Sequence, residues 1–282
     1  MDWVTAGSYA FVGAVMLVLL WPTTSTGRRF LKHWGVRDAS EEQVALAVRY
    51  LRNRRVLYPP LFLLAPLVLP TGWRPHVFVA AIAALLVAEA IGSFRPTRGL
   101  RVAGLTPRKW SDLVQRWAVV ALVLLGLLAI GLAVAGLVAQ PWADRVSTSA
   151  ALSDQARAEF GHPVGWTVIV MVVLGLVEVL GIIGFAVSRT SVQDPQVDAV
   201  LRTRSARVGA GIGIAWMASA AALAHDRLTF LNETHAPEPP PSWLASAPFG
   251  SGFGVLLGVI GLAGWYWVAN PGSKMRYAQS AT

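Results

Sequence analysis

The stretch "WTVIVMVVLGLVEVLGIIGFAV", residues 166–187, decides the fold class of this chain, because only one of its 22 residues is charged. An uncharged apolar run of about 20 residues is long enough to cross the hydrocarbon core of a bilayer as a helix. The single charge, Glu178, lies 12 residues after Trp166 and 11 before Arg189. We therefore expect a membrane-spanning helix with an acid at mid-depth.

Similar apolar runs recur along the 282-residue chain, which is 55% hydrophobic and 14% charged, unlike ordinary soluble domains. They predict an all-α membrane protein that forms a single integral membrane domain, residues 1–282. We place seven spans at roughly 3–21, 56–70, 76–94, 117–139, 166–187, 208–224 and 250–268. The second is the weakest, since it is short and contains Pro59, Pro60 and Pro66, which interrupt helical hydrogen bonding.

The basic residues indicate how the chain is oriented. Of the 24 Lys and Arg, 20 lie in segments 22–55, 94–116, 188–207 and 269–282, and the other four lie in the alternate loops. Cytoplasmic loops of membrane proteins carry such an excess of positive charge. We therefore expect the N-terminus outside and the C-terminus inside. Because topology explains the basic residues, the net charge of +9 does not indicate nucleic-acid binding.

Three of the inner segments share one pattern, in which a helix-capping residue is followed by apolar residues three and four positions apart. They are "SEEQVALAVRYLRNRR" (40–55), "TPRKWSDLVQRW" (106–117) and "DPQVDAVLRTRSAR" (194–207). In the first, Ser40 and Gln43 have the spacing of a capping box. The pattern predicts short amphipathic helices on the inner membrane surface. They would anchor the chain to the lipid bilayer or dock a cytoplasmic or membrane protein partner, and both alternatives remain open.

Glycines recur every four residues at Gly250, Gly254 and Gly258, and the same spacing joins Gly209 to Gly213. Small residues at this spacing let helix backbones approach closely in lipid. The glycines could serve dimerisation, but we favour packing between the sixth and seventh spans.

No motif for catalysis or cofactor binding is found. The chain has no cysteine, which excludes disulfides and thiolate metal sites, and no Ser/His/Asp grouping or phosphate-binding loop is present. The outer loop 225–249 gathers His225, Asp226, Glu233 and His235, but their spacing fits no standard metal motif. We therefore expect no enzymatic activity, no cofactor and no metal.

Two acids within the apolar runs are the candidate functional residues. Glu178 is the first, because an acid at mid-membrane is costly and is a functional candidate by default. It faces the bundle interior in our expectation, with Trp216 or Ser219 of the sixth span as its partner, and it could equally be structural. Glu89 is the second. It lies six residues before Arg95, so we expect it to extend to the inner surface toward Arg95 or Arg98.

The stretches "GRRFLKHWGVRDASEEQVALAVRYLRNRRVLYPP" (27–60) and "GLTPRKWSDLVQRW" (104–117) resemble multi-pass membrane proteins of high-GC bacteria that have no settled function. The resemblance covers roughly the first 120 residues. It implies an integral protein of the bacterial plasma membrane. The function we expect is a membrane component of a transport or export system; the alternative is a membrane scaffold, assembly or sensor protein.

Overall fold

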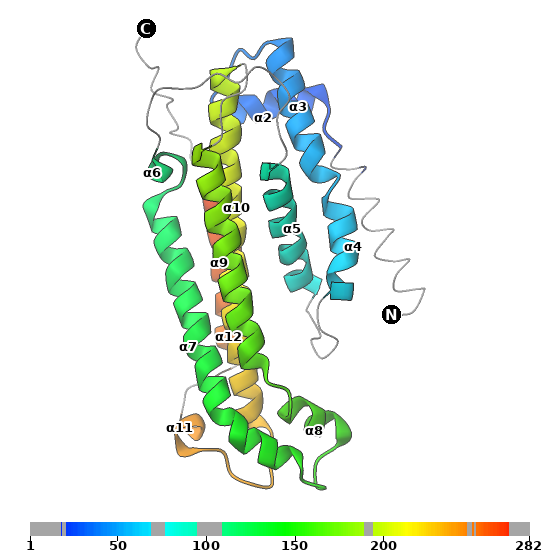
Figure 1. The fold of residues 1–282 in the computed structure, drawn as a ribbon, viewed down its shortest axis with the longest axis vertical. Helices are drawn as coiled ribbons and strands as arrows, with labels where there is room; N and C mark the ends of the chain where they lie inside the picture. The colour runs from blue at the N-terminus through cyan, green and yellow to red at the C-terminus, as the bar shows by residue number, and fades with distance from the viewer. Residues whose placement is uncertain are drawn as a thin grey trace. The chain divides into compact units, whose positions relative to one another are not determined.

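The structure is a computed structural model that describes residues 21–68, 77–94, 109–188, 194–246 and 252–270, together with Val18 and Gly250. All regular elements within these ranges are helices, which confirms the all-α prediction (Figure 1). In chain order they are α2 (Thr24–His33), α3 (Glu41–Arg55), α4 (Tyr58–Val68), α5 (Val77–Phe94), α6 (Trp110–Leu113), α7 (Arg116–Ser147), α8 (Asp154–Phe160), α9 (Val164–Ser188), α10 (Pro195–Glu233), α11 (Ser242–Ala245) and α12 (Gly252–Ala269).

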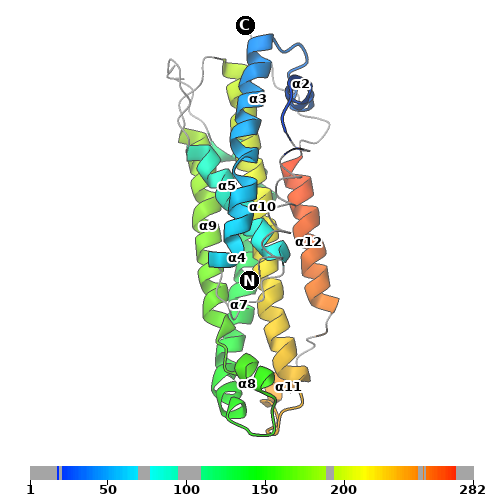
Figure 2. The same cartoon turned by 90° about the vertical axis from the view of Figure 1, so that its right-hand side faces the viewer.

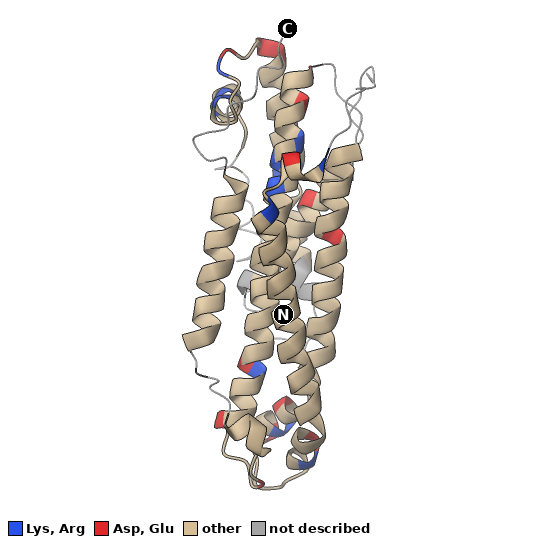
Figure 3. Cartoon of the chain, turned by 90° about the vertical axis from the view of Figure 1, so that its left-hand side faces the viewer, with Lys and Arg blue, Asp and Glu red and all other residues tan. Residues whose placement is uncertain are grey.

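Four helices in the described part are long and apolar enough to cross a membrane, namely α7, α9, α10 and α12. They correspond to four of the predicted spans, 117–139, 166–187, 208–224 and 250–268. Long stretches of α7, α9 and α12 carry no charged residue, and Figure 3 draws such uncharged stretches in tan. The chain is therefore a helical membrane protein by the length and composition of these helices.

The three earlier predicted spans have different outcomes. The first, 3–21, lies almost wholly outside the described residues. The third corresponds to α5, whose apolar part, Val79–Ser93, is a shorter apolar helix. The second is α4, only 11 residues long. Pro59 and Pro60 lie in the first turn of α4, where a missing N–H leaves no helical hydrogen bond unmade. Pro66 lies two residues before α4 ends.

The chain divides into two compact units. One comprises residues 1–118, 178–212 and 265–282, and the other comprises 119–177 and 213–264. The first unit contains the start of α7, the end of α9, the start of α10 and the end of α12. These four helices therefore alternate in direction along the chain. Within the first unit α2 packs against α3, and α4 packs against α5 (Figures 1 and 2).

The capping box predicted at the start of α3 is confirmed. Gln43 N–H donates to Ser40 Oγ at 3.3 Å, and Ser40 N–H donates to Gln43 Oε1 at 2.9 Å. These bonds satisfy two backbone donors that an uncapped helix would leave free. The side-chain amide of Gln43 also donates to Asp194, the residue before α10, at 2.6 Å. The start of α3 is thus attached to the start of α10.

The prediction of three separate surface helices is wrong for two of the three segments. The segment 194–207 is the uninterrupted beginning of α10, and its apolar face is covered by protein rather than by lipid. That face packs with α2, α3 and the turn after α2 in one buried cluster: Leu31, Trp34, Val44, Ala47, Val197, Val200 and Leu201. The described residues of the segment 106–117, which start at Lys109, form α6, one turn long, and the beginning of α7, because Val114 adopts an extended conformation and ends α6. Periodicity identified the apolar faces but could not show that two of them cover each other.

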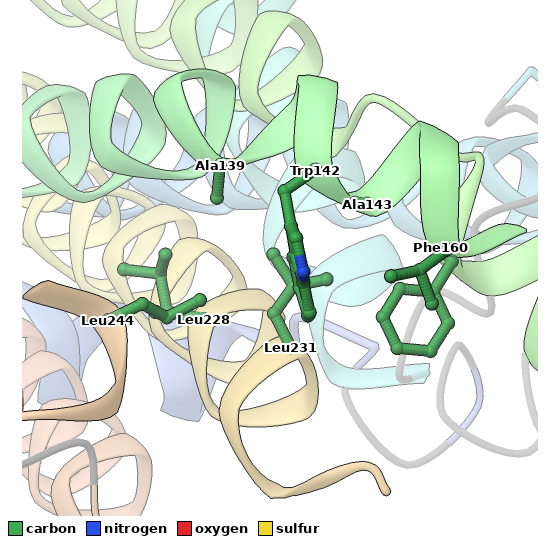
Figure 4. Close-up of a cluster of buried hydrophobic side chains, with 8 residues drawn as sticks. Ala139, Trp142, Ala143, Phe160, Leu228, Leu231 and Leu244 are labelled. Atoms are coloured by element: carbon green, nitrogen blue, oxygen red, sulfur yellow. The ribbon is translucent and has the colours of Figure 1, made fainter. Parts of the chain in front are cut away.

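The second unit has its own core near the ends of α7 and α10. Trp142 of α7 extends toward Leu231 of α10, and its ring meets Phe160 edge-on at 5.8 Å (Figure 4). Arg227 of α10 donates to the carbonyl oxygens of Glu159 and Phe160, at 2.7 and 2.8 Å. A guanidinium thus satisfies carbonyls at the end of α8, which a helix terminus would otherwise leave unpaired.

The glycines that bring α12 close to α10 are only partly those that the spacing suggested. A Cβ added at Gly261 would lie 2.8 Å from Ala218 Cβ, and one at Gly264 would lie 2.7 Å from Ile214. Gly254 is similarly close to Asp226, but Gly250 and Gly258 face open space. Packing between the sixth and seventh predicted spans therefore uses Gly261 and Gly264, while Gly254 packs against α10 beyond the sixth predicted span.

Candidate functional site

A fully buried ion pair joins α3 to α5. The guanidinium Nε of Arg54, in the last turn of α3, donates to Oε2 of Glu89 at 2.7 Å. The side chain of Arg54 is 2% exposed and that of Glu89 is not exposed at all. Gly92, one turn after Glu89 on α5, makes room for the pair, since a Cβ there would lie 2.9 Å from Arg54 Cγ.

The other oxygen of the Glu89 carboxylate has two further partners. The Tyr58 hydroxyl, at the start of α4, donates to Oε1 at 3.2 Å. The guanidinium of Arg204, on α10, lies 3.7 Å from the same oxygen. Four helices, α3, α4, α5 and α10, therefore converge on one carboxylate.

The guanidinium of Arg54 has further partners besides Glu89. Its Nη2 donates to Ser205 Oγ at 2.9 Å and to Ser93 Oγ at 3.3 Å, and its guanidinium lies 3.9 Å from the centre of the Tyr50 ring. The Tyr50 hydroxyl lies 2.9 Å from Ser205 Oγ and accepts from Arg204 at 3.0 Å. We call these seven residues the Arg54–Glu89 cluster: Tyr50, Arg54, Tyr58, Glu89, Ser93, Arg204 and Ser205.

The cluster carries an excess of positive charge. Two guanidiniums, those of Arg54 and Arg204, face the single carboxylate of Glu89. Burial, and next the positive charge of Arg204, lower the pKa of the neighbouring Arg55 below its usual value. Arg202, which lies on α10 like Arg204, is paired with Asp198 of the same helix, so that pair contributes no net charge. The Glu89 carboxylate therefore balances only part of the positive charge around it.

Energetics also distinguish the cluster from ordinary packing. Each buried ion costs several kcal/mol of desolvation, and replacing a buried pair by apolar side chains is often neutral or stabilising. A buried ion pair is thus weak support for stability. In a membrane protein, ionisable groups of this kind generally mark ion pathways or switching elements.

The expectation for Glu89 was wrong in its direction. We expected this side chain to reach the inner surface toward Arg95 or Arg98, which lie outside the described residues. Instead it is completely buried and bonded to Arg54, which precedes it by 35 residues. The reason is that α3 brings an arginine to the depth of Glu89, so the carboxylate finds its partner without leaving the protein.

Glu178 is differently placed from Glu89. It is half-buried on α9, next to the exposed side chains of Leu174 and Val177, and it forms no hydrogen bond or ion pair with the residues that the structure describes. The two partners that we expected are occupied. The indole N–H of Trp216 donates to the Met171 carbonyl at 2.9 Å, and the Ser219 hydroxyl donates to the Ala215 carbonyl at 2.8 Å.

Because an indole has one donor, Trp216 cannot also donate to a carboxylate. The predicted pairing is thus not formed in this structure. Whether Glu178 has a functional role stays a prediction.

Sequence reasoning identified only Glu89 of the cluster and missed the other six residues: Tyr50, Arg54, Tyr58, Ser93, Arg204 and Ser205. Arg54 and Arg204 were assigned to the positive charge of the inner segments. A signal was available, since Arg54 and Arg204 both lie directly before predicted spans while Glu89 lies shortly before the end of one. All three therefore belong near the same depth. What the sequence does not give is which helices are neighbours.

The fold and the cluster together define the class of this protein as a helical membrane protein with a buried, positively charged ionic cluster. In the described part of the chain, no three or more His, Asp or Glu side chains are grouped so that they could hold a metal ion. Comparison of the chain with protein-family models, with curated proteins and with solved structures finds no match.

Proposed function

We propose that this chain is a multi-pass protein of the bacterial plasma membrane and a membrane component of a transport system, with the Arg54–Glu89 cluster as its ion-responsive element. The observation that carries the proposal is a carboxylate with no exposed surface, facing two guanidiniums, where four helices of a membrane protein converge. The proposal adds no enzymatic activity.

The proposed topology has seven spans with the N-terminus outside and the C-terminus inside. The support is the charge bias, with 20 of 24 basic residues in the inner segments. The division of the chain agrees with it, because the ends of α7, α9, α10 and α12 that should be inside all belong to the first unit, together with α2 and α3. The inner face would then present α2, α3 and α6 to a cytoplasmic or membrane protein partner.

Protonation of Glu89 would change the contacts among these helices. A neutral Glu89 no longer compensates Arg54 and Arg204, and two guanidiniums without a carboxylate between them repel each other. The ion pairs that join α5 to α3 and to α10 would weaken together, since both use the Glu89 carboxylate. A proton that binds to Glu89 and leaves again would thereby change how these helices pack, which is the coupling that a proton-linked transporter needs.

The test compares the two intramembrane acids in sealed liposomes that contain the purified chain and a pH-sensitive dye, with a pH gradient imposed across the membrane. We expect the native chain to dissipate the gradient several-fold faster than empty liposomes. Glu89→Gln should reduce the rate to that of empty liposomes, because glutamine can neither take up nor release a proton. Glu178→Gln is the matched control and should retain the native rate. A native chain that is no faster than empty liposomes overturns the proposal of proton-linked transport.

One observation favours a second function, that of a membrane scaffold or assembly protein. On α9, Gly181 faces open space one turn after Glu178, beside exposed apolar side chains. Another membrane helix could approach closely there and donate a hydrogen bond to Glu178. Cross-linking in membranes distinguishes the two functions: a scaffold should lose its cross-linked partner on Gly181→Leu, whereas transport alone predicts no change.

A further inference from the structure

A cavity of 570 Å³ lies in the first unit, where α7 begins and α9 ends. Its lining consists of Lys109, Trp110, Ser111, Arg116, Gly184 and Val187. Its place between a short inner helix and two candidate membrane spans distinguishes it from the Arg54–Glu89 cluster, with which it shares no residue.

The polar side of the cavity is basic. The side chains of Lys109 and Arg116 are exposed, and neither forms an ion pair with the described residues. The nearby acid, Asp112, accepts a hydrogen bond from the backbone N–H of Lys109 at 3.2 Å and is not part of the lining. Ser111 adds a hydroxyl. Two cations and a hydroxyl form a donor set that fits a phosphate group.

The other side of the cavity is apolar and belongs to a membrane helix. Gly184 and Val187 lie in the last turns of α9, and nothing lies within 4 Å of a Cβ added at Gly184. Trp110, which belongs to the lining, is 44% exposed, and Trp117, which follows Arg116 in the chain, is 46% exposed. Exposed tryptophans are enriched at the boundary between membrane and water. The basic side of the cavity therefore suits a phosphate group, and its apolar side suits acyl chains.

We propose that this cavity binds the headgroup of an anionic phospholipid, with Lys109 and Arg116 on the phosphate and the acyl chains along the end of α9. Basic pockets between membrane helices bind such headgroups. Free inorganic phosphate is also an anion, but it has no apolar part that would contact Gly184 and Val187. The inference does not depend on the proposed transport function, since it uses none of the residues of the Arg54–Glu89 cluster.

The test measures binding of phosphatidylglycerol to the purified chain in detergent by native mass spectrometry, with phosphatidylcholine as the neutral lipid. We expect Lys109→Gln with Arg116→Gln to weaken phosphatidylglycerol binding about thirtyfold, the effect of two cation–headgroup contacts. The matched control, Arg29→Gln with Lys32→Gln, removes one Arg and one Lys that are exposed on α2 and should leave binding unchanged. Gly184→Leu, which narrows the cavity without changing its charge, should also weaken binding.

Two results would overturn the proposal. Equal binding of phosphatidylglycerol by the native chain and by the Lys109/Arg116 double variant would show that the cavity is not the lipid site. Complete displacement of phosphatidylglycerol by millimolar inorganic phosphate, with no preference over phosphatidylcholine, would show that the site takes a free anion. Retention of phosphatidylglycerol in the presence of phosphate supports the lipid as the source.

Discussion

The Nε atom of Arg54 lies 2.7 Å from Oε2 of Glu89, across 35 residues of sequence, and water reaches neither side chain appreciably. Each residue is therefore the main reason that the other can stay charged inside the protein. Removing one of these charges should therefore leave the other buried without its main partner.

Arg54→Met should lower the free energy of unfolding by about 3–5 kcal/mol, because it leaves the Glu89 carboxylate buried without its main counter-charge. Arg54→Met combined with Glu89→Met removes both charges and should recover most of that loss. Denaturant unfolding in detergent measures the difference. A single variant as stable as the native chain would contradict the ion pair, and a double variant less stable than the single one would indicate that packing, not charge, is limiting.

The proposed orientation can be tested with single cysteines, since the chain has none of its own. Thr148→Cys and Ser246→Cys, both at exposed positions of the predicted outer segments, should react with an impermeant thiol reagent on intact cells. Gln196→Cys, exposed at the start of α10, should react only after the cells are opened. Ser205→Cys should react in neither case, because Ser205 is buried against Arg54. Labelling of Gln196→Cys on intact cells would reverse the orientation.

Two glycines of α12 should respond in opposite ways to the same substitution. Gly261→Leu places a side chain where a Cβ would already lie 2.8 Å from Ala218 of α10, so we expect a loss of about 1–3 kcal/mol from overpacking. Gly258→Leu meets open space and should have little effect. Thermal unfolding of both variants in the same detergent compares them, and equal losses would show that α12 is not packed on α10 in this register.

Arg227→Met should destabilise the end of α8, because the two carbonyls that this guanidinium serves would lose a charged donor. Such a hydrogen bond contributes about 1.5–3 kcal/mol. Arg227→Lys should restore part of the loss. Arg157→Met is the matched control, since its pair with Asp154 is solvent-exposed and should contribute less than about 1 kcal/mol.

Hydrogen exchange of the α8 amides is the direct measurement for these variants. Faster exchange in Arg227→Met than in Arg157→Met is the expected order. The reverse order would mean that α8 is held by its own exposed ion pair rather than by Arg227.

The parts of the fold that could be predicted from sequence are those that depend on local physics. The start of α3 follows from Ser40 and Gln43, and the starts of α7 and α9 follow from where uncharged apolar residues begin. Ends were less certain: α7 continues to Ser147 and α10 to Glu233, because polar residues outside a membrane can extend a helix that an apolar window cannot detect.

The candidate site was harder to predict, since it depends on which helices are neighbours. Glu89 was recognised as unusual from its apolar surroundings, but its partner Arg54 is one of many arginines in an inner segment. Charge bias accounts equally for an exposed arginine such as Arg52 and for a buried one such as Arg54. Similarly, the apolar side chain of Val200 suits a lipid surface and a protein core alike, and only the fold shows that it packs against α2 and α3.

The uninterrupted course of α10 has a consequence for α2 and α3, which pack against its beginning. A helix of 39 residues is about 58 Å long, whereas the hydrocarbon layer is about 30 Å thick. The first part of α10, residues 195–203, should therefore extend beyond the lipid, with α2 and α3 packed against it through the buried apolar cluster. For a rod of that length, a tilt of one degree moves the far end by about 1 Å. A small tilt of α10 within the membrane would thus displace α2 and α3, which pack against its beginning.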